Sequence, residues 1–253
     1  MPTLSKKQVV TAPKSKRFRI GSPISLINQQ NIAPYRGMHQ GKTAVLVGTG
    51  PTLNDYHPIS DAIHIGVNNS IYFPHPMDYL FLMDQRGPTT YLANKKDYDS
   101  YQARIQKFYA KFRLQSEFGV TDADARAGNA KFFEVIRPTT DYLPGEKDVG
   151  NRLFGLPVST IFTALQFILY TGVTQIYIVG CDLSDDNYKI GARIRHAFLD
   201  QTWVRVKSWI QKAYPTVRIG SINPQGLKGM FQDFEWSPEQ QIYVTMNSQP
   251  SDT

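Results

Sequence analysis

Short apolar runs alternate with helical patterns along most of this 253-residue chain, and polar clusters follow several of the runs. The runs of strand length are Thr43–Val47, Ala62–Val67, Asp78–Met83, Phe132–Ile136, Gln175–Gly180 and Val217–Ile222. Helical patterns precede and follow the run that ends at Gly180, over about 159–170 and 198–213. Such alternation is typical of α/β domains, in which helices connect the strands of a parallel sheet. The sequence therefore predicts an open, mostly parallel, twisted sheet flanked by helices.

The charge distribution divides the chain into parts. Residues 1–42 contain eight Lys and Arg residues and no Asp or Glu, whereas the rest of the chain is nearly neutral, so the net charge of +7 comes from this segment. A segment this basic, and rich in Ser, Pro and Gln, buries little apolar surface. We expect a basic, disordered arm over 1–38, one α/β domain over 39–236 with a small helical insertion or lid over about 95–150, and a loose tail over 237–253.

This distribution also limits the partners of the chain. Because the positive charge lies in the arm, the sequence does not indicate a nucleic-acid-binding domain. The arm is either a plain solvated tail or a contact for anionic lipid or a phosphorylated acceptor. Neither a bilayer-spanning apolar stretch nor a signal peptide is visible, and the single Cys181 excludes an internal disulfide. We expect a cytoplasmic protein, with peripheral contact to the inner face of the membrane left open, and Cys181 as a small buried apolar residue.

The first strand breaks into the turn Gly48-Thr49-Gly50-Pro51-Thr52-Leu53, which suits a phosphate. Gly48 and Gly50 allow the backbone to approach a ligand closely, Pro51 can open a helix, and Thr52 can cap that helix or bond an oxyanion. The backbone N–H groups of the turn and the positive end of a following helix would face the anion. The pattern is neither the dinucleotide fingerprint nor a P-loop. A tight turn without a ligand is the alternative.

Polar side chains also follow two later strands. Asn68 and Asn69 can pair with a base or a ribose, or simply form a turn. Asp182, Asp185 and Asp186 can hold a divalent ion that bridges phosphates, or bind nothing. Ligands of open α/β sheets bind beyond the carboxyl ends of the strands. This placement predicts a site at that edge of the sheet.

His196 is the most distinctive of the five histidines, because Arg193 and Arg195 precede it and a predicted helix follows it. Two nearby cations and a helix N-terminus disfavour the charged imidazolium, so a neutral ring can accept a proton at pH 7. General base catalysis of this kind contributes about 10²–10⁴-fold to a rate. A surface or N-capping histidine is the alternative.

The order of these residues resembles a known family. Gly48-Thr-Gly-Pro-Thr-Leu53, Gly66-Val-Asn-Asn-Ser70, the apolar helix ending Tyr170-Thr-Gly172, Gln175-Ile-Tyr-Ile-Val-Gly-Cys-Asp182 and His196 follow one another as in the Campylobacter-type bacterial sialyltransferases of glycosyltransferase family 42. They also resemble the wider DUF115 group, which includes the archaeal 6-hydroxymethylpterin diphosphokinase and flagellin-modifying glycosyltransferases. The match covers about residues 43–83 and 150–222. It implies a Rossmann-like, GT-A-like fold.

The resemblance further implies a glycosyltransferase that moves a sugar, such as sialic acid, from a CMP-linked donor to a saccharide acceptor of a surface glycan. No metal or cofactor would be needed. His196 would take the proton of the acceptor hydroxyl. Tyr188, Arg193 and Arg195 would steady the leaving phosphate in place of the family's tyrosine pair, which this chain lacks. The nucleotide-binding residues would be Gly48, Thr49, Gly50, Pro51, Thr52, Asn68, Asn69, Ser159, Thr160 and Asp182.

Two other functions stay open on the sequence. One is an ATP- and Mg²⁺-dependent diphosphokinase of the pterin type, with Asp182, Asp185 and Asp186 on the metal. The other is a nucleotide-binding module that kept the fold and lost catalysis. The family usually has Asn and Ser where this chain has Thr49 and Thr52, so the donor sugar is also open. The oligomeric state is not indicated.

Overall fold

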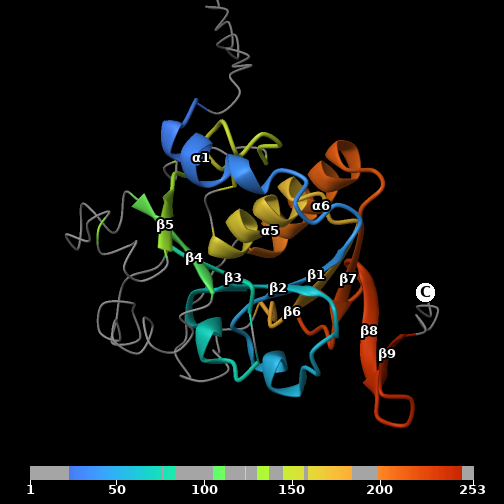
Figure 1. Ribbon diagram of the computed structural model, residues 1–253. Coiled ribbons are helices and arrows are strands. Elements are labelled where there is room, and N and C mark those ends of the chain that lie inside the picture. The colour runs from blue at the N-terminus through green and yellow to red at the C-terminus, as the bar shows by residue number, and fades with distance from the viewer. Residues whose placement is uncertain are drawn as a thin grey trace, which may run out of the picture.

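The computed structural model describes residues 23–75, 77–83, 105–111, 123, 130–136, 145–156, 159–183 and 199–246. These residues form a nine-stranded sheet with the strand order β5-β4-β3-β2-β1-β6-β7-β8-β9 (Figure 1). Strands β1 to β8 are parallel to their neighbours, and β9 pairs antiparallel with β8. The strands are β1 Thr43–Val47, β2 Ile63–Val67, β3 Tyr79–Leu82, β4 Gln106–Ala110, β5 Ala130–Phe133, β6 Gln175–Val179, β7 Arg218–Ile222, β8 Gln232–Ser237 and β9 Ile242–Thr245. The predicted open, mostly parallel α/β sheet is confirmed.

Helices cover one face of this sheet (Figure 1). They are α1 (Leu26–Asn31), α5 (Thr160–Tyr170) and α6 (Leu199–Ala213). All residues of α5 are buried, which explains why its sequence is apolar on every side. Helix α6 buries only a stripe that includes Trp203, Val206 and Ile210. Within the described part of the chain, no helix is long and apolar enough to span a membrane.

The opposite face carries short 3₁₀ helices, η2 (Pro51–Asp55) and η3 (Asn68–Tyr72). Successive residues of a strand point to opposite faces, so the sheet separates two apolar clusters. Leu46 and Phe81 belong to the cluster beneath α5, where they lie with Phe167. Val45 and Val47 belong to the other cluster, with Leu53 of η2. Both faces of the central strands are therefore buried.

The described residues within 95–150 do not match the predicted helical insertion or lid. Strands β4 and β5 both lie in this range and extend the parallel sheet beyond β3. The polar residues Gln106 and Lys107 interrupt the apolar pattern of β4, although the side chain of Lys107 is fully buried. The predicted Phe132–Ile136 strand exists, with bounds shifted to β5.

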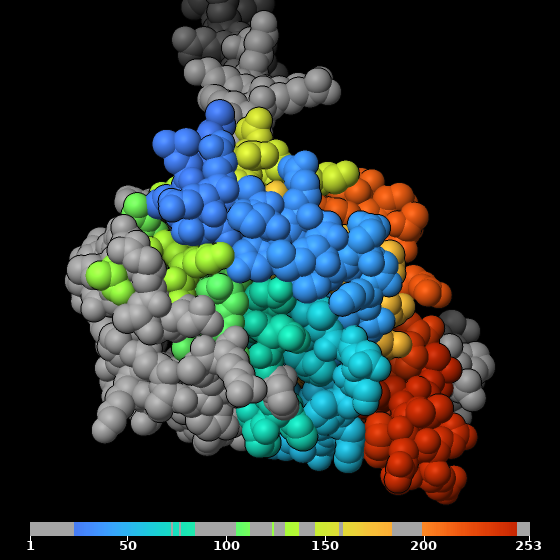
Figure 2. Space-filling view, in the orientation of Figure 1, coloured from blue at the N-terminus to red at the C-terminus, as the bar shows by residue number. Residues whose placement is uncertain are grey.

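The prediction that residues 23–38 belong to a disordered arm is wrong. Helix α1 packs against the edge strand β5, and the 3₁₀ helix η1 (Ala33–Tyr35) follows it. Figure 2 shows the atoms of this segment, in blue, against the body of the molecule. The buried Asn28 amide donates to the carbonyls of Glu134 and Arg152 and accepts from the Glu134 N–H at 2.8 Å. These bonds satisfy backbone groups that an open sheet edge would expose. Residues 1–22 lie outside the described residues.

The expected loose tail from residue 237 is also wrong in part. Strand β9 pairs with β8, and the hydroxyl of Tyr243 accepts from the His57 N–H and donates to its carbonyl. The ring of His57 stacks on Trp236 with 4.2 Å between the centroids. These contacts anchor the β8–β9 hairpin to the segment after η2. Residues 247–253 lie outside the described residues.

Gln166 holds α5 against the segment that precedes it. Its buried amide accepts from the N–H groups of Glu146 and Gly155 and donates to the carbonyls of Gly155 and Phe162, at 2.8 to 3.1 Å. All four hydrogen-bonding positions of the amide are thus used.

Gln166→Leu should destabilise the fold by about 3 kcal/mol or more, because it leaves several buried backbone groups unpaired. Urea unfolding measures this change. Gln211→Leu on the exposed side of α6 is the matched control, and its effect should stay within about 0.5 kcal/mol. Similar small effects of both substitutions would contradict the role given to Gln166.

Candidate functional site

The strand order reverses between β1 and β6. From β1 the chain adds strands in one direction as far as β5, and it then returns to place β6 on the other side of β1. In open α/β sheets such a reversal marks the ligand-binding crevice, beyond the carboxyl ends of the strands. The predicted Gly-rich turn and Asp182 both lie at this junction.

The Gly-rich turn packs directly on the end of β6. The Gly48 N–H donates to the carbonyl of Val179 at 2.8 Å, and the Gly50 N–H donates to that of Gly180 at 2.7 Å. A Cβ on Gly48 would overlap the Gly180 carbonyl, and one on Gly50 would overlap the carboxylate of Asp182. The glycines are therefore required by this close approach of two backbones. The expectation that the N–H groups of the turn would face an anion is wrong for these two, and also for those of Thr52 and Leu53, which donate to the carboxylate of Asp182 and to the carbonyl of Gly50.

Asp182 joins the two loops through Thr52. Its carboxylate accepts from the Thr52 N–H at 2.9 Å and from the Thr52 hydroxyl at 2.5 Å. Burial raises the pKa of Asp182 above its ordinary value, while the two bonds from Thr52 oppose this rise because they favour the charged form. Thr52 is the second residue of η2, which ends at Asp55. Asp182 thus fixes the conformation of the turn.

Neighbouring residues support Asp182. Gly180 has φ +67°, a conformation that favours glycine and turns the chain out of β6. The Gly226 N–H donates to the Asp182 carbonyl at 3.1 Å, and a Cβ on Gly226 would overlap this carbonyl. Cys181 is partly buried against the α5-side cluster, and burial raises the pKa of its thiol. Gly226 is not among the predicted site residues, because its only signal in the sequence is its position after a predicted strand.

A second pair of predicted residues joins β2 to α5. The Asn68 amide donates to the Thr160 hydroxyl at 3.2 Å and accepts from the Met83 N–H at 3.3 Å. Asn68 has φ +46°, a left-handed conformation that Asn tolerates better than most residues. Because Thr160 is the first residue of α5, this bond places the N-terminus of the helix at the carboxyl edge of the sheet. Ser159, the N-cap of α5, makes no side-chain capping bond.

The described residues therefore bring the predicted nucleotide-binding set together at one edge. Asn69 and Thr49 are half-buried there, beside Asn68 and the glycines of the turn. The N-terminus of an 11-residue helix, with about half a positive charge, lies at the same edge. This edge can hold an anionic group between α5 and the loops after β1 and β2.

The predicted catalytic residues lie outside the described residues. They are Tyr188, Arg193, Arg195 and His196, and the alternative metal ligands Asp185 and Asp186 are also outside. Among the described residues, no group of three His, Cys, Asp or Glu side chains is arranged to hold a metal ion. The roles of the predicted catalytic residues and of the two alternative metal ligands remain predictions from the sequence.

Thr52→Val tests the link between the two loops. Valine keeps the shape of threonine but lacks the hydroxyl that donates to the buried carboxylate, so the free energy of unfolding should fall by about 1.5–3 kcal/mol. Thr52→Ser keeps the donor and should cost about 1 kcal/mol or less. Urea unfolding at pH 7 compares the two, and a serine variant as unstable as the valine variant would contradict the importance of this bond.

Comparisons with known proteins agree with this fold. No family model matches the chain, and no curated protein matches its sequence. The MAf glycosyltransferase from Magnetospirillum magneticum AMB-1 superposes with a TM-score of 0.51 at 12% identity, over 88% of this chain and 40% of that chain. Two structures of the sialyltransferase CstII from Campylobacter jejuni also match. The complex with cytidine-5′-monophosphate has a TM-score of 0.41 at 9% identity, over 72% of this chain and 80% of that chain. The complex with CMP-3FNeuAc has a TM-score of 0.37 at 11% identity, over 82% of this chain and 91% of that chain.

These comparisons concern the fold. The chain spans well under half of the length of the MAf glycosyltransferase that it matches. It shares an α/β fold with this glycosyltransferase, and its own sheet is open and mostly parallel.

Proposed function

We propose that this protein is a glycosyltransferase that moves a sugar from a nucleotide donor to a saccharide acceptor. The observation that carries the proposal is the meeting of the Gly48–Thr52 turn, Asp182 and the Asn68–Thr160 pair at the carboxyl edge, where the strand order reverses. A fold shared with a glycosyltransferase supports it. The resemblance of the sequence motifs to the sialyltransferases favours a CMP-linked acidic sugar as the donor.

In this proposal the nucleotide lies across the ends of β1, β2 and β6. The donor phosphate binds at the N-terminus of α5, where Ser159 and Thr160 offer hydroxyl groups and the helix offers its positive end. The amides of Asn68 and Asn69 contact the nucleoside. Asp182 acts through Thr52, because its carboxylate holds the turn in place for the ligand. It is a positioning residue.

The reaction is a substitution at the anomeric carbon. His196 takes the proton of an acceptor hydroxyl while the hydroxyl oxygen forms the new bond to that carbon. The bond from the anomeric carbon to the phosphate oxygen breaks, and the nucleotide leaves with the electron pair. Arg193, Arg195 and Tyr188 stabilise the negative charge that develops on the phosphate. The acceptor is a saccharide of a surface glycan, and the basic segment before residue 23 can bring the enzyme to an anionic membrane surface.

Calorimetry and transfer assays together test this function. The protein should bind CMP in preference to UDP, GDP and ATP, and EDTA should leave that affinity unchanged. His196→Ala should lower the transfer rate by about 10²-fold or more while CMP binding stays within about twofold, because the base acts only in the chemical step.

Three results would contradict the proposal. Binding of ATP that requires Mg²⁺ would favour the diphosphokinase. Binding of no nucleotide would favour a module that has lost catalysis. Full transfer activity of His196→Ala would remove the role of the base.

A further inference from the structure

A hollow lies at the end of the strands opposite the candidate donor site. It has a volume of about 730 Å³, in the size range of ligand sites, and it opens at the amino ends of β1, β6, β7 and β8. Thr43 lines it at the start of β1, whereas Gly48 belongs to the candidate donor site after the same strand. Five residues of extended chain separate the two, which corresponds to about 16 Å. The hollow is therefore distinct from the donor site.

The register of the strands places its polar residues side by side. Thr43 is opposite Gln175, and Gln175 is opposite Arg218. Gln232 lies one row further along, opposite Gly220. These side chains offer two amides, a hydroxyl and a guanidinium to one open space.

Two aromatic rings form a corner of the hollow. A Cβ on Gly220 would lie 2.5 Å from the ring of Phe234, so this ring lies over the glycine. The ring of Phe234 meets that of Tyr177 edge to face, with centroids 5.2 Å apart and an interplanar angle of 83°. Both residues are half-buried, packed against the cluster on the η2 side of the sheet. Apolar ring surface thus remains available in the hollow beside the amides.

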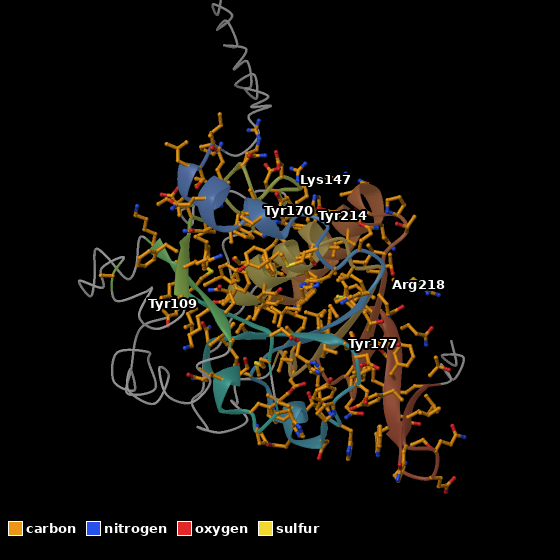
Figure 3. All side chains as sticks on the ribbon, viewed as in Figure 1. Tyr109, Lys147, Tyr170, Tyr177, Tyr214 and Arg218 are labelled. Atoms are coloured by element: carbon orange, nitrogen blue, oxygen red, sulfur yellow. The ribbon has the colours of Figure 1, made fainter. Side chains whose placement is uncertain are left out.

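Arg218 gives the hollow its charge. The residue is exposed, and Figure 3 shows it near Tyr177, on the side of β7 and β8. Within the described part of the chain the ion pair found is that of Arg36 with Asp148, so Arg218 has no carboxylate partner there. A planar guanidinium binds a carboxylate through two parallel hydrogen bonds. The hollow therefore offers a place for a single carboxylate.

The amino edge of the sheet, where the hollow opens, is less suited to a phosphate than to a carboxylate. The carbonyl end of α5 lies here, since the N–H groups of His39 and Gly41 donate to the carbonyls of Thr171 and Gly172. This end of a helix carries about half a negative charge, which disfavours a doubly charged group. A sugar unit has apolar C–H faces for the rings, hydroxyls for the amides and, if acidic, one carboxylate for Arg218.

We propose that this hollow binds an acidic saccharide, as a glycan-binding site separate from the donor site. The proposal rests on the proposed function, since the glycan it would hold is the acceptor or product of transfer. The hollow retains a carboxylate-bearing unit of the glycan at one edge of the sheet, away from the nucleotide at the other. Tyr177 and Phe234 contact the sugar faces, and Arg218 binds the carboxylate.

Titration calorimetry with a linear tetramer of sialic acid, in the absence of nucleotide, tests the site. The full chain should bind this tetramer more tightly than neutral maltotetraose. Arg218→Gln should weaken binding of the acidic tetramer by about tenfold or more, through loss of a charge-assisted pair, without changing the affinity for CMP. Lys228→Gln removes the same charge from an exposed residue outside the hollow and should change neither affinity by more than about twofold.

The outcomes separate a specific saccharide site from non-specific attraction to positive charge and from failure of the proposed function. Equal weakening by Arg218→Gln and Lys228→Gln would mean attraction to net positive charge and would overturn the site, as would no binding of the tetramer. Tyr177→Leu, with its folding checked by circular dichroism, should weaken the binding of the acidic and the neutral tetramer to the same extent. Unchanged binding of both would overturn the role of the rings. Because no nucleotide is present, failure here leaves the test of CMP binding and His196 unaffected.

Discussion

The pairing of β1 with β6 is the contact on which the candidate site depends. These strands are adjacent in the sheet although about 130 residues separate them in sequence. Their ends are joined by Asp182, which accepts two hydrogen bonds from Thr52, and by glycines that let the loops touch. A buried carboxylate that satisfies both a backbone N–H and a hydroxyl specifies one arrangement of the loops, because any other would leave polar groups unpaired.

The rest of the carboxyl edge follows from this junction. Helix α5 returns the chain to β6, and its start is tied to the end of β2 by the bond between Thr160 and Asn68. Gln166 ties the same helix to the segment before it. The positive end of α5 therefore lies among the loops after β1 and β2. The opposite edge carries aromatic rings, amides and Arg218, so the two ends of the sheet differ in the ligands they suit.

The buried centre of the fold could be predicted from the sequence, and its periphery could not. Strand β1 is continuously apolar because it is covered on both faces of the sheet, and helix α5 is apolar because it is buried on all sides. The predicted bounds of both elements are almost correct. Strand β4 was not predicted, because the polar residues Gln106 and Lys107 interrupt its apolar pattern. Lys107 is nevertheless buried, and this burial results from tertiary packing that the local sequence does not reveal. Helix α1 is held by hydrogen bonds of the Asn28 side-chain amide to the backbone of Glu134, the residue that follows β5 and lies over 100 residues away in the sequence. No local pattern contains that information.

The candidate site shows the same division. The types of residue at the strand ends predict a site at the carboxyl edge, and the structure brings these residues together there because parallel strands all place their carboxyl ends at one edge. The pairing of Thr52 with Asp182 was not predictable, since either could equally have bound the ligand or solvent. The N–H groups of both glycines of the turn donate to the carbonyls of Val179 and Gly180 at the end of β6. We therefore expect a phosphate at the start of α5 and not on these glycines.

The affinity of Asn68→Asp for CMP tests most directly whether a nucleotide binds at this edge. Aspartate can keep the bonds to Met83 and Thr160, since the Thr160 hydroxyl can donate instead of accept, but it adds a negative charge beside the phosphate. Gln211→Glu adds the same charge at the exposed end of α6. By calorimetry, Asn68→Asp should bind CMP about tenfold or more weakly than the wild type, and Gln211→Glu within about twofold. Wild-type affinity in Asn68→Asp would contradict a nucleotide site at the carboxyl edge of the sheet.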